Sequence, residues 1–202
     1  NPGIAVVMQD QAEAFADQVS AALAGSGAQV MLTDGIAAAF AKGRDRVASE
    51  PGIRAVLTQM CDRRQATPQL FVVQGADWLG NHVLAEEVFG PLGLIVVAKD
   101  AGEMREIAAS MQGQLTATLH LDAGDTELAQ GLMPILERKD GRVLANGYPT
   151  GVEVADAMVH GGPYPASTNF GATSVGTMSI RRFLRPVCYQ NMPEALLPED
   201  LR

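Results

Sequence analysis

The first part of the chain carries apolar residues at helical spacing. Residues 10–24 place apolar side chains three to four positions apart, with an aspartate at the start and Gly25 after the end, which predicts an amphipathic helix. Thr33 or Asp34 is a suitable cap for a second helix that runs to about Ser49. Two helices are therefore expected before residue 50.

The middle of the chain alternates between short apolar runs and helical patterns. The run at residues 92–98 is almost continuously apolar and rich in β-branched residues, as expected of a strand buried on both faces. Predicted strands cover residues 53–60, 69–74, 92–98, 114–121 and 142–146, and predicted helices cover residues 101–111 and 125–137, with Gly141 marking a turn. This alternation predicts largely parallel pairing, right-handed crossovers and helices on both faces of the sheet. The expected fold class is α/β, a three-layer domain with a largely parallel βαβ sheet.

Regular structure is expected to stop after Asn146. Glycine and proline are too frequent between residues 147 and 176 for continuous helix or strand, which indicates a long functional loop. Residues 183–193 are a candidate edge strand, because Pro186 is incompatible with a central position in a ladder. No repeat or linker divides the chain, so residues 1–202 are expected to form a single domain.

Composition argues against several classes of partner. The 202 residues contain 15 Lys and Arg against 23 Asp and Glu, a net charge of −8 that repels nucleic-acid backbones. The apolar run at residues 94–98 is far shorter than the roughly 20 residues of a membrane-spanning helix, and no signal-peptide pattern opens the sequence. Cys61 and Cys188 lie far apart, without CxxC spacing, which fits reduced thiols. We expect a cytoplasmic protein with no nucleic-acid and no membrane partner.

The most informative motif is Glu-Glu-Val-Phe-Gly-Pro at residues 86–91, directly before an apolar strand. A carboxylate can accept hydrogen bonds from both hydroxyls of a ribose, and an aromatic side chain beside it can pack against a flat ring. The alternative is structural: Glu86 and Glu87 are a solvated pair, and Phe89 belongs to the core.

This motif resembles the coenzyme-contacting loop of aldehyde dehydrogenases. Asn1-Pro2-Gly3 resembles the segment directly after the catalytic Cys-Thr pair of that family, and Asn146-Gly147-Tyr148 with the glycine-rich loop resembles the lining of its aldehyde funnel. The matches occur in the family's order, and the resemblance covers essentially the whole chain. It implies a fold of the aldehyde dehydrogenase catalytic-domain type.

The resemblance also implies roles for individual residues. Glu87 would hold the nicotinamide ribose of NADP or NAD, and Phe89 would pack near the nicotinamide. The substrate pocket at the aldehyde entrance would include Pro149, Thr150, Gly151, Gly162 and Pro163. Residues 1–202 would be the C-terminal catalytic part, with the nucleophilic cysteine just before Asn1 and the coenzyme domain upstream. No catalytic residue is then expected in this chain, and the fragment alone is expected to be inactive.

A finer resemblance concerns the substrate. Residues 161–167, 173–177 and 185–193 resemble the branch containing α-ketoglutaric semialdehyde dehydrogenase, which oxidises 2,5-dioxopentanoate to 2-oxoglutarate. That branch commonly has an arginine before Thr-Ser-Val-Gly, where this chain has Asn-Phe-Gly-Ala at residues 169–172. Long-chain aldehyde dehydrogenases of the same branch therefore stay an alternative. The tail resemblance favours NADP over NAD, and family members form homo-oligomers partly through a C-terminal strand.

Two readings from other classes compete with the dehydrogenase. A non-catalytic α/β assembly module would use its tail strand to pair with a partner's sheet edge. A thiol hydrolase would use Cys61 with His82 or His120 as the base, although a structural thiol is the more ordinary fate of such a residue. His82, His120 and His160 are too dispersed to predict a metal site.

Overall fold

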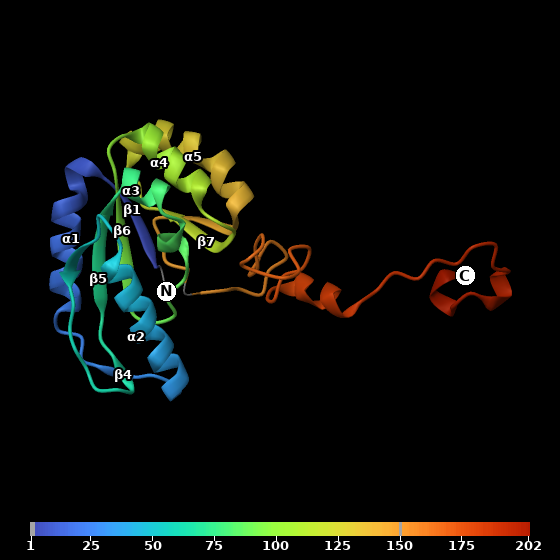
Figure 1. The fold of residues 1–202 in the computed structure, drawn as a ribbon. Helices are drawn as coiled ribbons and strands as arrows, with labels where there is room; N and C mark the ends of the chain where they lie inside the picture. The colour runs from blue at the N-terminus through green and yellow to red at the C-terminus, as the bar shows by residue number, and fades with distance from the viewer. Residues whose placement is uncertain (1–2, 150) are drawn as a thin grey trace.

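A four-stranded sheet forms the centre of the computed structural model, which describes residues 3–149 and 151–202 (Figure 1). The predictions that concern Asn1, Pro2 and Thr150 lie outside the described residues. The strand order is β1–β6–β5–β3. β1, β6 and β5 run parallel to one another, and β3 is antiparallel to β5 at the edge. The bounds are β1 (Ile4–Met8), β3 (Arg54–Leu57), β5 (Gln69–Gln74) and β6 (Leu92–Ala98).

Helices cover both faces of this sheet (Figure 1). Because side chains alternate along a strand, β5 and β6 supply apolar residues to two cores. One face packs against α1 (Gln9–Leu23), and the opposite face packs against α2 (Asp34–Ser49), α3 (Gly75–Gly80) and α4 (Ala101–Ser110). The first core contains Ala12, Ala16, Leu70, Val72, Ile95 and Val97, and the second includes Val47, Phe71, Val73, Trp78, Leu94, Val96 and Ile107. The three-layer α/β prediction is confirmed.

A second parallel pair lies beside this body. β7 (Gln114–Leu119) and β8 (Asp140–Ala145) are joined by η2 (Ala123–Asp125) and α5 (Thr126–Lys139), which makes a βαβ unit. Two short strands, β2 (Gln29–Val30) and β4 (Gln65–Ala66), pair antiparallel, and η1 (His82–Ala85) follows α3. The remaining described 3-10 helices are η3 (Thr177–Phe183), η4 (Glu194–Leu196) and η5 (Glu199–Leu201). None of the described helices has the length and hydropathy needed to span a membrane.

Most predicted elements are present, and the second helix begins after Thr33, one of its two predicted caps, whose Oγ1 accepts a hydrogen bond of 3.1 Å from the Ile36 amide. Three points of the prediction need correction. Strand β1 was not predicted. The predicted turn at Gly141 is wrong, because Gly141 lies inside β8. A Cβ at Gly141 would lie 1.9 Å from the Gly161 carbonyl oxygen, so this glycine permits the close approach of another segment.

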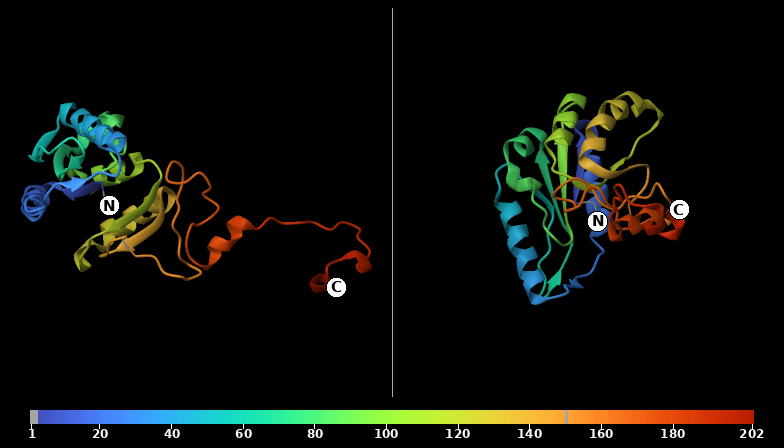
Figure 2. Two further views of the ribbon diagram at one scale, coloured as in Figure 1. Left: turned by 90° about the horizontal axis from the view of Figure 1, so that it is seen from below. Right: turned by 90° about the vertical axis from the view of Figure 1, so that its right-hand side faces the viewer.

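The third correction concerns the tail. Residues 184–193 form no strand in the described chain and extend away from the sheets (Figure 2). A strand needs a partner edge for its amide and carbonyl groups, and this segment pairs with none of the described strands. Its large apolar side chains are exposed, and with Phe183 they are Leu184, Val187, Tyr189 and Met192.

Candidate functional site

The loop at residues 86–91 connects η1 to β6 and lies against α2. The Glu86 carboxylate forms an ion pair with Arg46 of α2. Val88 points to the same helix, since a Cβ placed on Gly43 would lie 2.8 Å from Val88 Cγ1. The absence of a side chain at Gly43 therefore lets the loop approach the helix closely.

Gly90 closes the loop beneath a buried aromatic ring. Its φ of 150° is a conformation that residues with a Cβ rarely adopt. A Cβ there would also lie 2.3 Å from Cδ2 of Phe40, which is buried on α2. The next residue, Pro91, accepts a hydrogen bond of 2.8 Å from the Gln69 amide, directly before the β5–β6 ladder begins. Both the conformation and the contact require glycine at residue 90.

Glu87 and Phe89 point the other way. Because residues 86, 88 and 90 face α2, the residues between them face outward. Phe89 is 71% exposed, so the structural alternative, in which it belongs to the core, is wrong. Glu87 is exposed and makes no hydrogen bond or ion pair with another described residue. The loop thus presents a free carboxylate and an aromatic ring on an anchored backbone. This arrangement suits a ligand that carries hydroxyl groups beside a flat ring.

Arg142 of β8 holds the first part of the glycine-rich segment. Its guanidinium donates hydrogen bonds to the carbonyl oxygens of Pro149 at 3.1 Å and Gly151 at 2.9 Å. These two bonds bracket Thr150, which lies outside the described residues. Two predicted pocket residues are therefore tied through their backbones to one strand.

The second part of the segment lies on the first residues of β7 and β8. Gly162 is buried, and a Cβ there would lie 2.3 Å from the Gln114 carbonyl oxygen. A Cβ on Gly113 would similarly lie 2.2 Å from the Pro163 carbonyl oxygen. Pro163 lines an open depression of about 540 Å³ together with Gln112, Gly113, Arg138, Lys139, Tyr164 and Pro165. Gly162 thus serves close packing, whereas Pro163 faces open space.

The structure does not bring the two predicted groups into one cavity. Neither this depression nor a smaller one includes residues 86–91, and no hydrogen bond between described side chains joins the loop to the glycine-rich segment. The smaller depression, about 210 Å³, lies between α2 and the residues after β3. It includes Gln69, whose Nε2 donates hydrogen bonds to the Gln59 carbonyl at 3.0 Å and to Thr67 Oγ1 at 3.1 Å.

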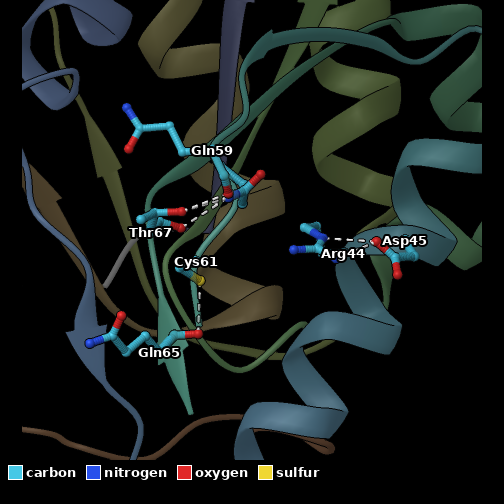
Figure 3. Close-up of polar contacts among 7 residues, drawn as sticks. Arg44, Asp45, Gln59, Cys61, Gln65 and Thr67 are labelled. Atoms are coloured by element: carbon cyan, nitrogen blue, oxygen red, sulfur yellow. Dashed lines mark hydrogen bonds and ion pairs between the residues drawn. The ribbon is translucent and has the colours of Figure 1, made fainter. Parts of the chain in front are cut away.

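Cys61 is not paired with an imidazole. Its thiol donates a hydrogen bond of 3.0 Å to the Gln65 carbonyl oxygen (Figure 3). His120 instead packs against Tyr148, with ring centroids 5.4 Å apart, and His82 lies in η1. The arrangement lacks the thiol–imidazole contact that a thiol hydrolase needs.

Acid–base and metal chemistry have few candidates in the described part of the chain. No three His, Cys, Asp and Glu side chains of residues 3–149 and 151–202 are grouped so that they could hold a metal ion. Burial raises the pKa of Asp140 to about 6. Asp140 is the first residue of β8 and is paired in register with Gln114. None of the described hydrogen bonds connects its carboxyl group to a side chain that could exchange a proton with it.

Sequence reasoning missed the face of α2 that supports the loop. Phe40, Gly43 and Arg46 are spaced three apart, so they lie along one side of the helix and each contacts one residue of the loop. The signal was present as a large, a small and a charged residue at helical spacing. The three residues alone do not identify the segment that they contact, because only the fold places the loop beside the helix.

No protein-family model matches the chain, but curated proteins and solved structures do. The chain is 48% identical over 205 residues to an alpha-ketoglutaric semialdehyde dehydrogenase 2 of Azospirillum brasilense, which covers 100% of this chain and 39% of that protein. It is 44% identical over 177 residues to an alpha-ketoglutaric semialdehyde dehydrogenase of Acinetobacter baylyi, with 86% of this chain and 34% of that protein covered. The chain therefore spans about two fifths of the length of these relatives or less.

Similar solved structures share the fold at low sequence identity. A Delta-pyrroline-5-carboxylate dehydrogenase of Mycobacterium tuberculosis aligns with a TM-score of 0.69 at 11% identity, covering 96% of this chain and 39% of that one. An aldehyde dehydrogenase of Bacillus cereus, solved as an NAD+ complex, aligns with a TM-score of 0.68 at 14% identity, covering 88% of this chain and 36% of that one. Together with the curated relatives, these matches show that the chain belongs to the aldehyde dehydrogenase superfamily, in the branch of the alpha-ketoglutaric semialdehyde dehydrogenases.

Proposed function

We propose that this chain is the C-terminal catalytic part of an NAD(P)-dependent aldehyde dehydrogenase and that the loop at residues 86–91 holds the nicotinamide end of the coenzyme. The observation that carries the proposal is the outward pair of Glu87 and Phe89 on a loop whose other residues are anchored on α2. A coenzyme that accepts hydride must be held in one pose, and a fixed backbone between two anchors provides such a support.

Each residue of the pair has a separate task. The Glu87 carboxylate accepts hydrogen bonds from the two hydroxyls of the nicotinamide ribose. The Phe89 ring is exposed, so it can cover one side of the nicotinamide and restrict rotation about the glycosidic bond. When bound, NAD or NADP supplies the acceptor for the hydride that leaves the aldehyde carbon. The chain itself orients that acceptor.

Glu87→Gln tests this role in the complete dehydrogenase. The amide keeps one acceptor oxygen but loses the charge, so coenzyme binding should weaken by about 1–2 kcal/mol, or roughly tenfold in Kd, without loss of stability. Asp17→Asn is a matched control, because Asp17 is an exposed carboxylate on α1, across the sheet from α2. Coenzyme titrations in which both variants match the wild type would contradict the proposed role of Glu87.

We place the nucleophilic cysteine and the remaining coenzyme contacts in a longer polypeptide. The support is that the curated relatives are more than twice as long as the region they share with this chain. The denatured mass of the purified protein tests this point. A mass well above 21.3 kDa is expected, whereas a mass of 21.3 kDa with aldehyde-dependent reduction of NADP would contradict it.

The proposed substrate is 2,5-dioxopentanoate, which would be oxidised to 2-oxoglutarate. The alternative is a long-chain aldehyde, favoured by the absence of an arginine at residues 169–172. A substrate carboxylate needs a cation or hydrogen-bond donors in its site, whereas an alkyl chain needs an apolar pocket, so the two substrates should differ widely in kcat/KM. We expect a higher kcat/KM for 2,5-dioxopentanoate than for decanal, and the reverse order would assign the enzyme to long-chain aldehydes.

We also propose that the enzyme is a homo-oligomer held together partly by its tail. Residues 184–193 expose four large apolar side chains and unpaired backbone groups, which suits strand addition to a second copy. Light scattering on the complete protein and on a version ending at Phe183 tests this. An unchanged oligomer after truncation would contradict the role of the tail. A pure assembly module would in addition keep all its properties after changes at Glu87 and Phe89.

A further inference from the structure

One ion pair connects α2 to the first residue of the candidate coenzyme loop. Arg46 and Glu86 are 40 positions apart in the sequence, and their side chains are 38% and 57% exposed. Glu86 directly precedes Glu87. The pair therefore lies next to the residue to which the proposed function assigns the ribose contact.

The stability of the fold does not explain this pair. Ion pairs between partly exposed side chains contribute little, because water already solvates both charges. The Nε atom of Arg46 is also buried and has no hydrogen-bond partner among the described residues, which opposes the gain from the pair. A methionine at residue 46 could fill the same space without that cost.

The position of the pair suggests a different purpose. After Glu87, the loop is held by Val88 against Gly43 and by Gly90 against Phe40. Before Glu87, the loop itself contacts α2 through the Glu86 ion pair, and the next buried anchor is Leu84 of η1, which lies in the core that contains Val47. Without the ion pair, the nearest buried anchor before Glu87 would therefore lie three residues away.

We propose that Arg46 is a positioning residue for the coenzyme, acting through Glu86 to fix the backbone at Glu87. This inference rests on the proposed function of the loop. The ion pair holds the first side of Glu87, the two apolar contacts hold the second side, and the carboxylate is thereby directed outward. Because Arg46 pairs with the carboxylate of Glu86, the carboxylate of Glu87 is the one in the loop that stays free to accept hydrogen bonds from a ligand.

The test uses the complete dehydrogenase with Arg46→Met and Arg46→Lys. We expect Arg46→Met to raise the KM for NADP or NAD about fivefold, with a small change in kcat and an unchanged melting temperature. Arg46→Lys keeps a cation within reach of Glu86 and should recover most of the affinity. Arg54→Met is the matched control, because it breaks another exposed ion pair, of 2.7 Å, between Arg54 and Glu13. It should leave the KM unchanged.

Glu86→Gln separates positioning from simple charge repulsion. If Arg46 only shields the anionic coenzyme from Glu86, removing the charge of Glu86 should strengthen coenzyme binding. If Arg46 positions the loop, Glu86→Gln should weaken binding about as much as Arg46→Met, and the double variant should be no worse than either single variant. Tighter binding by Glu86→Gln would overturn the inference.

Glu87→Gln distinguishes failure of the inference from failure of the proposed function. If Glu87→Gln weakens coenzyme binding and Arg46→Met does not, the positioning role of Arg46 is wrong and the function of the loop stands. If neither variant changes coenzyme binding, the proposed function of the loop is wrong, and the inference falls with it.

Discussion

Gly90→Ala is the most severe small change that the structure offers in the candidate loop. The substitution adds one methyl group at a backbone φ of 150°, where residues with a Cβ are strained. The same methyl group would meet Phe40 at 2.3 Å from Cδ2 and 2.8 Å from Cε2. Phe40 is only 3% exposed, so its ring cannot swing into solvent.

Two costs add at this position. An unfavourable backbone conformation costs about 1–3 kcal/mol, and forcing an extra carbon into a packed site typically costs about 1–3 kcal/mol. Gly90→Ala should therefore destabilise the protein by about 2–6 kcal/mol, or move the loop away from α2 and weaken coenzyme binding instead. Either response follows from the same contact.

Urea denaturation of the complete protein measures the first response, and coenzyme titration measures the second. Gly25→Ala is the matched control, because nothing lies within 4 Å of a Cβ at Gly25. Adding Phe40→Leu to Gly90→Ala should recover part of the steric cost, so the two changes should not be additive. A Gly90→Ala variant within about 0.5 kcal/mol of the wild type, with unchanged coenzyme affinity, would refute this view of the loop.

Two further predictions concern groups outside the loop. The pKa of Asp140 is raised by burial from 3.8 to about 6, so the ionised carboxylate costs stability that is regained as pH falls through 6 toward 3.8. Asp140→Asn should thus stabilise the protein by about 1 kcal/mol at pH 7.5, after allowance for solvent screening, with a difference that shrinks toward pH 4; a constant difference between these pH values would contradict the assignment. Cys61 is partly buried and bonded to the Gln65 carbonyl, so its alkylation by iodoacetamide at pH 7 should be slow, and rapid selective labelling followed by peptide mapping would revive the thiol hydrolase.

The local sequence pattern predicts those helices and strands whose structure is determined by their own residues. Strand β6 and helix α2 follow from a β-branched apolar run and from the Thr33 cap. Strand β1 is also a short apolar run, but helix α1 follows it directly at Gln9, and periodicity alone does not separate five apolar residues in a strand from the start of a helix. Its pairing with β6, which joins Ile4 to Leu94, decides the strand and depends on residues far away in the sequence. The tail failed as a strand for the related reason that no described edge pairs with it.

The candidate site shows the same division. The family resemblance of residues 86–91 predicted that Glu87 and Phe89 contact the coenzyme, whereas the residues alone also allowed Phe89 a place in the core. Its exposure is decided by Val88 and Gly90, which face α2 on alternate positions. The glycine-rich segment was recognised as a loop, whereas the close contact of Gly162 with Gln114 depends on how that loop returns to β7.

A crystal structure of the complete protein with bound NADP or NAD would show whether the loop at residues 86–91 holds the nicotinamide end of the coenzyme. We expect an oxygen of the Glu87 carboxylate to lie within about 2.5–3.0 Å of a hydroxyl of the nicotinamide ribose, with Phe89 against the nicotinamide. A bound coenzyme that leaves Glu87 in solvent and does not contact Phe89 would contradict this role of the loop.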